Sequence, residues 1–367
     1  DRGSFHGHVG HARRGPLVPL PGAFVQWSGA RWQDEALLAG GEIASISCSP
    51  ARSTRAKAAG AGPFSAHLAW VPGVASLDSP APMDPFVAAF LQLVESDPQA
   101  AVALGPLERV SRAQIAERAE VERATLERRG LPPGSTIALS APAGPAFLWA
   151  WLALRMAEMT VLLVDTAIPP AERRRVAVRL GAAGSWSLDE GWSSSSGHGS
   201  LECFQVRPRR LPPNVVCLKL TSGSTGEPAA IAVSTEQLHS DYLQLEASLD
   251  LRGGDRFLVL LPLSHSYGFS VLASPALLRG AALVFPSAED PDRIAAQHEA
   301  SVVASVPSWY RAQSALAGRK AWPACTRTFL SAAAPLAPEL ARSWRSKNGR
   351  PIHAFYGSSE CGGITFD

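Results

Sequence analysis

The sequence has few cysteines, and none of them is spaced for a metal site or a disulfide framework. The five in 367 residues are Cys48, Cys203, Cys217, Cys325 and Cys361, without a CxxC pair. An odd number of scattered cysteines argues against a zinc site and against a small secreted domain held together by disulfides. The pattern favours a reducing compartment, and we expect a cytoplasmic protein.

The chain also lacks a long uncharged apolar segment and an excess of charge of one sign. Its longest apolar stretch, 146–157, contains Arg155 and is shorter than the roughly 20 residues that a membrane-spanning helix needs. Its 34 basic and 32 acidic residues leave a net charge of +2. We therefore expect no transmembrane segment and no nucleic-acid partner. The N-terminus shows no signal-peptide pattern.

Hydrophobic periodicity is nearly absent from residues 1–82, which are rich in Gly, Pro, Ala, Ser and Arg. Regular patterning begins just after Met83, the first methionine of the chain. We interpret 1–82 as a disordered leader or a read-through segment, and 83–367 as the folded domain.

From Asp84 onward, segments with helical spacing alternate with short apolar strands. Strands separated by helices are typical of parallel sheets that are covered by helices. The expected fold class is α/β, with doubly wound, largely parallel sheets flanked by helices. Strands are expected at 101–104, 136–139, 161–164, 201–206, 215–220, 229–233, 257–261, 281–285, 302–306 and 328–330, and helices at 84–96, 111–129, 145–157, 171–180, 234–249, 272–280 and 291–298.

One stretch between two expected strands has the composition of a phosphate-binding loop. It reads Thr221-Ser222-Gly223-Ser224-Thr225-Gly226. Its hydroxyls can donate to phosphate oxygens, and its glycines let backbone N–H groups turn inward. The stretch is neither a Walker loop nor a GxGxxG motif. Taken alone, a Ser/Gly/Thr cluster is more often an ordinary loop.

Two later stretches also place reactive or aromatic groups directly after strands. Residues 262–268 form the expected exit loop of one strand and carry His265 and Tyr267, with Phe269 just beyond. Tyr356-Gly357-Ser358-Ser359-Glu360 joins an aromatic ring, hydroxyls and a carboxylate. Ligands of open α/β sheets gather beyond the carboxyl ends of the strands. These residues are therefore candidates for one site.

In this order, the three stretches resemble the motifs of the adenylate-forming superfamily of acyl-CoA synthetases, luciferases and peptide-synthetase adenylation domains. The family motifs read Thr-Ser-Gly-Ser/Thr-Thr-Gly-x-Pro-Lys, Pro-Leu-x-His and Tyr-Gly-x-Thr/Ser-Glu. The resemblance covers 83–367 and implies the AMP-binding N-terminal domain of such an enzyme. It further implies a carboxylic acid, ATP, Mg²⁺, and either CoA or an acyl carrier protein as partners.

The resemblance also implies roles for particular residues. The loop 221–226 would hold the leaving pyrophosphate, and Thr225 and Glu360 would bind Mg²⁺. Tyr356 would stack on adenine beside the turn Ala333-Ala334-Pro335, with Gly357 and Ser358 next to it. Ser359 would reach the α-phosphate and His265 would complete the catalytic group. The substrate pocket is expected to be lined by Tyr267, Phe269, Ser308, Gly362 and Gly363.

Two departures from the family pattern are visible. Ala229 stands where the family usually has the lysine of its first motif. The residues that the family places after its third motif, including the small C-terminal domain, are absent from the chain. We therefore expect the chain alone to bind ATP weakly and not to complete thioester synthesis.

Three functions remain open at this point. They are a synthetase that makes a fatty or aromatic acyl-CoA, an adenylation domain that loads a carrier protein, and a non-catalytic nucleotide- or acyl-binding remnant. The segment 307–309 has two interpretations, since it either lines an acyl pocket or begins a helix with Trp309 packed inside.

Overall fold

A computed structural model describes residues 83–189, 199–205, 211–212, 214–221, 229–252, 254–286, 291–316 and 321–367. The expectation for residues 1–82 lies outside this part of the chain. Most of the expected phosphate loop, residues 222–228, lies outside it as well.

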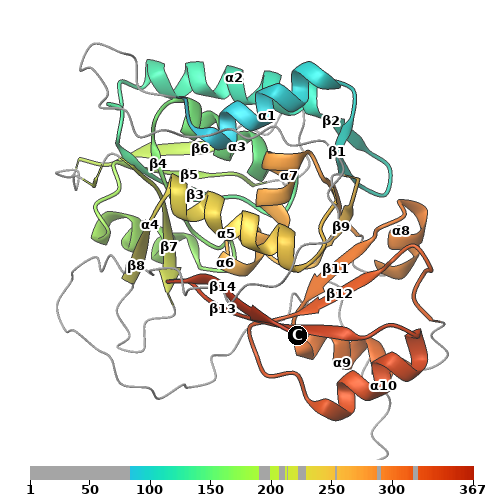
Figure 1. The fold of residues 1–367 in the computed structure, drawn as a ribbon. Coiled ribbons are helices and arrows are strands. Elements are labelled where there is room, and N and C mark those ends of the chain that lie inside the picture. Colours follow the sequence, from blue (N-terminus) through green and yellow to red (C-terminus); the bar gives the residue numbers. More distant parts are fainter. Residues whose placement is uncertain are drawn as a thin grey trace, which may run out of the picture. The chain divides into compact units, whose positions relative to one another are not determined.

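Six of the described strands form a first sheet in the order β6-β5-β3-β4-β7-β8 (Figure 1). The four central strands β5, β3, β4 and β7 are parallel, and the edge strands β6 and β8 are antiparallel to their neighbours. The bounds are β3 Thr136–Ser140, β4 Thr160–Leu163, β5 Gly184–Ser187, β6 Ser200–Cys203, β7 Val215–Thr221 and β8 Ala229–Ser234.

Eight of the described strands form a second sheet in the order β14-β13-β12-β11-β9-β10-β1-β2. The inner strands are parallel, while β2 and β14 pair in the antiparallel sense. The long strand β13 pairs with β12 through its first half and with β14 through its second half. The bounds are β1 Ala101–Leu104, β2 Arg109–Ser111, β9 Arg256–Val259, β10 Ala282–Val284, β11 Val302–Ser305, β12 Thr328–Ser331, β13 Ile352–Ser358 and β14 Gly362–Phe366.

Most helices begin at residues suited to a helix start. Ser111 and Ser234 form capping boxes with Gln114 and Gln237, and several other helices begin with a proline whose fixed φ suits the first turn. The bounds are α1 Pro85–Ser96, α2 Arg112–Arg128, α3 Pro145–Met156, α4 Pro170–Arg179, α5 Thr235–Ser248, α6 Ser266–Gly268, the π-helix η1 Phe269–Ala273, α7 Ser274–Arg279, α8 Pro291–Gln297, α9 Pro307–Ala315 and α10 Pro338–Asn348.

The expected α/β class with largely parallel, helix-flanked sheets is confirmed. One local expectation was wrong, because 262–268 is not a loop throughout. A helix begins at Ser266 and continues through η1 into α7. Gly268 has ordinary helical φ there, and a Cβ on it would lie 2.0 Å from the carbonyl oxygen of Pro262. This glycine therefore serves close packing rather than flexibility.

Three core clusters show how the helices cover both faces of each sheet. The largest lies between the sheets and draws residues from both of them and from α1, α3, α5, η1 and α7. A second cluster packs α8, α9 and α10 on the other face of the second sheet. The third packs α4 on the other face of the first sheet. The doubly wound arrangement follows from this layering.

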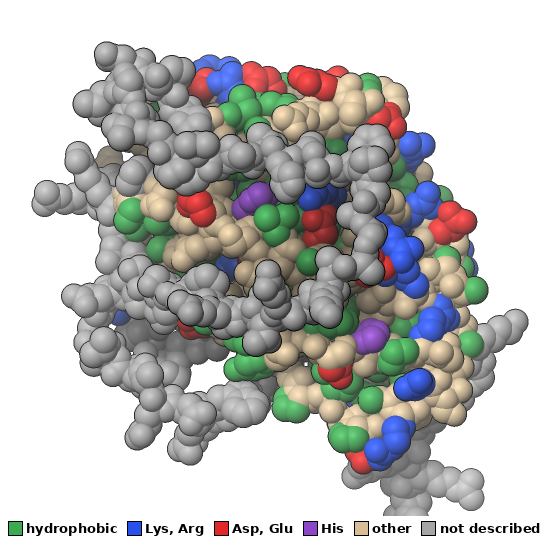
Figure 2. Space-filling model, viewed as in Figure 1, with side chains coloured by type: hydrophobic (Ala, Val, Ile, Leu, Met, Phe, Trp, Pro, Cys, Tyr) green, Lys and Arg blue, Asp and Glu red, His purple; other side chains and the backbone are tan. Residues whose placement is uncertain are grey.

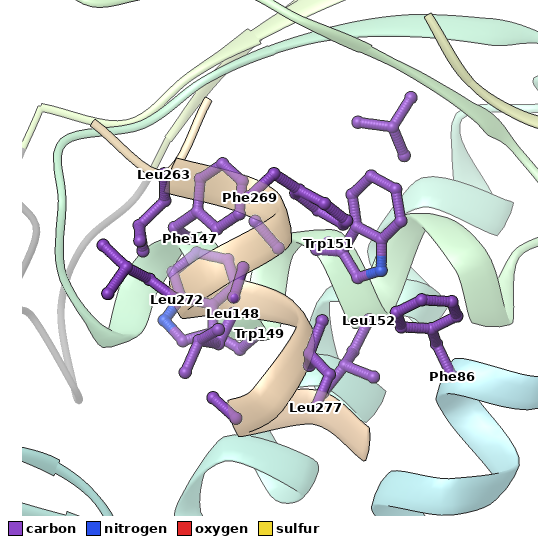
Figure 3. Packing of buried hydrophobic residues seen from close by; sticks show 14 of the residues in the cluster. Phe86, Phe147, Leu148, Trp149, Trp151, Leu152, Leu263, Phe269, Leu272 and Leu277 are labelled. Atoms are coloured by element: carbon purple, nitrogen blue, oxygen red, sulfur yellow. The ribbon is translucent and has the colours of Figure 1, made fainter. Parts of the chain in front are cut away.

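Phe269 belongs to the largest cluster, so the expectation that it lines a substrate pocket was wrong. Its side chain is 0% exposed. Its ring lies 4.6 Å from that of Trp151, 6.4 Å from that of Phe147 and 6.5 Å from that of Phe86, measured between centroids (Figure 3). The aromatic residue seen beside a motif in the sequence is a core residue on the neighbouring helix.

The segment 307–309 begins α9, as the second interpretation expected. Trp309 packs against Tyr310 and Trp322, with ring centroids 5.0 and 5.7 Å away. The Tyr310 hydroxyl donates to the carbonyl of Leu330 at 2.8 Å, which ties the helix to β12. Ser308 lies exposed in the first turn of α9.

No helix in the described ranges is both long and apolar enough to cross a bilayer. On the face shown in Figure 2, basic and acidic side chains are interspersed rather than separated into patches.

Candidate active site

Several of the predicted site residues that the structure describes lie at or beyond the carboxyl ends of parallel strands. In the first sheet, Thr221 ends β7, and Asp165, which was not predicted as a site residue, follows β4. In the second sheet, His265 follows β9, the turn 333–335 follows β12, and the segment 356–360 contains the end of β13 and the two residues after it. Parallel strands bring their carboxyl ends to one edge of a sheet, so the topology gathers these residues at two edges.

A histidine–aspartate contact joins these two edges. His265 Nε2 hydrogen-bonds Asp165 Oδ2, and Asp165 also accepts the N–H of Ala167 at 2.8 Å. The side chain of Asp165 is 16% exposed and that of His265 is 58% exposed. Burial raises the pKa of Asp165, but the hydrogen bonds from His265 and Ala167 and the charge of Arg173 lower it by more. Asp165 is thus an ionised anchor for the imidazole.

Replacing Asp165 with Asn should lower the free energy of unfolding at pH 7 by about 0.5–1 kcal/mol, because His265 is largely exposed and the charged hydrogen bond becomes neutral. The folded-state pKa of Asp165 is depressed, so this stabilisation is present above the usual carboxyl pKa near 4. It is lost as the pH falls through the folded-state value. Urea unfolding of both proteins between pH 2.5 and 7 tests this. Equal stability at pH 7 would contradict it.

A serine pair connects the second and third motifs. The Ser266 hydroxyl donates to Ser359 Oγ at 3.0 Å. In the turn that follows β13, Ser358 Oγ accepts the N–H of Cys361 at 3.2 Å. Glu360 lies exposed at this turn. The Ser266–Ser359 hydrogen bond therefore brings the third motif next to His265, as expected if the two motifs belong to one site.

Asp241 of α5 hydrogen-bonds both the hairpin of β13 and β14 and the segment after His265. Its Oδ1 accepts the N–H of Gly363 at 2.8 Å, and its Oδ2 accepts the hydroxyl of Ser270 in η1 at 2.6 Å. Gly362 has a left-handed φ of +70°, and a Cβ there would lie 2.3 Å from Asp241 Oδ1. The two glycines that were expected to line the substrate pocket thus face α5, where they permit close approach.

Replacing Gly362 with Ala should destabilise the protein by about 1–3 kcal/mol through backbone strain and the clash with Asp241. Gly130→Ala is a matched control, since Gly130 also has φ +70° but nothing lies within 4 Å of its added Cβ. That variant should lose only about 1 kcal/mol. Urea unfolding of the two variants separates the cost of the clash with Asp241 from the cost of backbone strain. Equal losses of stability in the two variants would show that Asp241 moves aside without cost.

The residues expected to hold adenine lie on neighbouring strands. Ser331 of β12 pairs with Ala354 of β13, so the turn 333–335 and Tyr356 follow the same edge. Tyr356 is 62% exposed, which leaves its ring available for stacking. Ala333 has a left-handed φ of +68°. Such strain in a residue other than glycine clusters at ligand sites.

Tyr267 stacks on Phe355 beside these motifs. The two ring centroids are 5.7 Å apart and the planes are inclined by 23°. The Tyr267 hydroxyl is buried, has no hydrogen-bond partner among the described residues, and has a pKa raised by burial. The pair forms a flat apolar surface with one buried polar atom.

Only the base of the expected phosphate loop belongs to the described chain. Thr221 pairs with Ala229 across β7 and β8, and its hydroxyl donates to the Ala229 carbonyl at 3.5 Å. The predictions for Ser222, Gly223, Ser224, Thr225 and Gly226 lie outside the described residues.

The expected metal site would have few protein ligands. Within the described ranges, no three His, Cys, Asp or Glu side chains gather into a metal-binding group. Mg²⁺ often binds through one or two carboxylates, with phosphate oxygens and water completing its shell. The exposed carboxylate of Glu360 fits such a site.

Sequence reasoning missed Asp165, Asp241 and Ser266 as site residues. Ser266 was inside a motif that had been singled out, whereas Asp165 was seen only as the end of a strand. Asp241 carries no local signal, because its partners lie on other elements.

Residues 185–367 match the family model described as AMP-binding enzyme. Together with the fold, this match places the chain in the AMP-binding, adenylate-forming enzymes, as the resemblance predicted. Its described domain has the fold of their N-terminal domain.

Two solved structures illustrate the shared fold. The inhibitor-bound N-terminal domain of FACL13 from Mycobacterium tuberculosis has a TM-score of 0.65 and 17% identity, over 77% of this chain and 78% of that one. ATP-bound MatB from Rhodopseudomonas palustris has a TM-score of 0.64 and 23% identity, over 78% and 61%.

Curated relatives are similar over only part of their length. Feruloyl-CoA synthase of an Amycolatopsis species is 30% identical over 172 residues, which are 44% of this chain and 34% of that protein. Pyochelin synthetase PchE of Pseudomonas aeruginosa is 27% identical over 294 residues, which are 74% of this chain and 20% of that protein. The chain therefore spans about a third or less of these relatives.

Proposed function

We propose that the protein activates a fatty or aromatic carboxylic acid as an acyl-adenylate and transfers the acyl group to a thiol, that of CoA. The observation that carries this proposal is the meeting of the second and third motifs in the Ser266–Ser359 hydrogen bond, next to the His265–Asp165 contact that joins the two sheets. Feruloyl-CoA synthase, by its name a CoA ligase of an aromatic acid, supports the choice of CoA.

The reaction needs two anions to be held together and charge to be neutralised. The substrate carboxylate attacks the α-phosphorus of ATP, a new C–O–P bond forms, and pyrophosphate leaves with the electrons of the broken P–O bond. Catalysis of this kind rests on positioning and electrostatics. When bound, Mg²⁺ neutralises phosphate charge, and Glu360 with Thr225 would hold it.

The remaining residues would bind and orient the reactants. Tyr356 and the turn 333–335 would hold adenine, and the hydroxyl of Ser359 would donate to the α-phosphate. His265, held by Asp165, would keep its imidazole beside the reacting carboxylate. The loop 221–226 would receive the departing pyrophosphate through its hydroxyls and amides.

The Tyr267–Phe355 stack supports a flat or long apolar acid, since a planar ring pair offers favourable contact to such a group. A substrate panel in which only small polar amino acids react would overturn this choice.

A carrier protein is the second candidate acceptor, because the similarity to pyochelin synthetase PchE covers 74% of this chain. A nucleotide- or acyl-binding remnant is the third candidate, motivated by Ala229.

The test is carboxylate-dependent exchange of labelled pyrophosphate into ATP by the purified full-length protein. Aromatic and fatty acids should support exchange, and CoA and a phosphopantetheinylated carrier protein should then be compared as acceptors. Absence of exchange with every acid, despite measurable ATP binding, would favour the remnant.

We also propose a reducing compartment, the cytoplasm, for this reaction. The described cysteines Cys203, Cys217, Cys325 and Cys361 are free thiols. Cys217 is fully buried, and this burial raises its pKa to about 12, so it is not a nucleophile at neutral pH.

A further inference from the structure

Lys219 is a buried cation in the strand that leads to the expected phosphate loop. It lies in β7, two residues before Thr221, and its side chain is 3% exposed. None of the hydrogen bonds and ion pairs found within the described residues involves its side chain, and its ammonium nitrogen is not one of the fully buried polar atoms that lack a partner. Lysine is almost never this buried unless it is paired, because removing an ammonium group from water is costly. A partner for this charge is therefore expected.

The strand pairing fixes the side of the sheet on which Lys219 lies. Lys219 is opposite Leu163 of β4. Side chains alternate along a strand, so Lys219 shares a face with Cys217 and Thr221, and Leu163 shares it with Asp165. Cys217 and Leu163 belong to the cluster between the two sheets.

This face is the one on which the two motif-bearing edges meet, because Asp165 uses it to contact His265. Asp165 lies two residues beyond Leu163, the partner of Lys219 on the neighbouring strand. Lys219 and Asp165 are therefore offset by about 6.6 Å along the strands and about 4.8 Å across them, a separation that the flexible four-carbon side chain of lysine can bridge. Lys219 is therefore placed just inside the candidate active site.

Three half-buried carboxylates are already engaged by other groups. Asp165 binds His265, Asp241 binds Gly363 and Ser270, and Asp84 pairs with Arg155 at 2.8 Å. Burial dominates the raised pKa of Cys217, while the charges of both Lys219 and Arg155 oppose it. Two cations therefore act on one buried thiol, and of these Arg155 has its counter-ion within the chain.

We propose that Lys219 completes the site by binding an anionic oxygen of a reactant, either the carboxylate of the acid or a phosphate of ATP. This inference rests on the proposed function. It adds a positively charged group to the proposed site, the side chain of Lys219 in strand β7 of the first sheet. The described residues place no acidic side chain against this lysine, and a bound anion would supply the opposite charge. Neither the loop 221–226 nor Glu360 supplies a positive charge.

The test compares Lys219→Met and Lys219→Gln with Lys347→Met, which removes an exposed lysine from α10. The KM values for ATP and for the acid are measured separately in the exchange assay. We expect either Lys219 variant to raise one of them about 10- to 100-fold, as loss of a charged hydrogen bond would. The affected reactant identifies the anion. Lys347→Met should leave both unchanged.

Thermal unfolding separates ligand binding from a structural role. Replacing an uncompensated buried charge with an uncharged side chain of similar volume is neutral or stabilising. The melting temperature of Lys219→Met should therefore stay constant or rise, whereas loss of a structural ion pair would lower it. A lower melting temperature with unchanged KM values for both reactants would overturn the inference.

Calorimetric binding of ATP and pyrophosphate keeps this test separate from the proposed function. If no acid supports exchange but the Lys219 variants still bind ATP or pyrophosphate at least tenfold more weakly, the inference stands and the proposed function fails. If exchange occurs and Lys219→Gln has unchanged KM values and unchanged binding, the inference fails alone. Absence of any binding of ATP, pyrophosphate or acid to the unmodified protein overturns it as well.

Discussion

Replacing Glu360 with Gln should reduce Mg²⁺-dependent pyrophosphate exchange by about 100-fold or more, while the free energy of unfolding stays within about 0.5 kcal/mol of its original value. Glu360 is exposed at the turn between β13 and β14, so its carboxylate contributes little to folding. The amide has a similar shape but no negative charge to hold a divalent cation.

The control is Glu339→Gln, which removes an exposed carboxylate from α10. Glu339 pairs with Arg342 at the surface, and this exposed pair contributes little to stability. Exchange by this variant should match that of the original protein. If Glu360→Gln keeps normal activity across a Mg²⁺ titration, the assignment of the metal to this carboxylate is wrong.

Replacing Phe269 with Ala should lower the free energy of unfolding by about 3–5 kcal/mol, the usual cost of removing a buried aromatic ring. The ring contacts Trp151, Phe147 and Phe86 in the core between the sheets, so its removal leaves a cavity among rigid neighbours. Urea unfolding measures the loss.

Val121→Ala on the outer face of α2 is the matched control, because Val121 is exposed. It should change stability by no more than about 0.5 kcal/mol. The pocket interpretation gives the opposite result for Phe269→Ala, namely a higher KM for the acid at unchanged stability. That outcome would restore Phe269 to the substrate site.

Much of the fold was accessible from the sequence, because its central strands are apolar and its helices have clear starts. The strand expected at 136–139 is β3 at Thr136–Ser140, and the helix expected at 145–157 is α3 at Pro145–Met156. Strand β5, with the sequence Gly-Ser-Trp-Ser, gave no such signal. It becomes a strand because β3 offers it a hydrogen-bonding edge, which is a tertiary effect.

The site was predictable only where a motif is continuous in the chain. His265, Ser359 and Glu360 stand in such motifs, and their roles stay predictions. The residues that hydrogen-bond the motif segments are distant in the sequence. Asp165 is 100 residues from His265, and Asp241 is 122 residues from Gly363. No pattern within a short window contains this information.

The glycines beside the motifs show a second limit. Sequence reasoning placed Gly268 in an exit loop and Gly362 in a pocket. The structure gives both a packing role, against Pro262 and Asp241. A glycine in the sequence marks a position where a side chain is excluded. The atoms that exclude it come from other segments, which become its neighbours only in the folded protein.

The pairing of β1 with β10 has a consequence for how the protein is made. Ala103 lies opposite Leu283, so 180 residues, including the whole first sheet, are synthesised between the two partners. At a translation rate of about 5–20 residues per second, about 10–35 s pass between the synthesis of β1 and the synthesis of β10. During that time its free edge and the apolar side chains of Val102 and Ala103 are open to pairing with other chains. Yield in a cell should therefore depend on chaperones that cover nascent chains, more than on the stability of the finished domain.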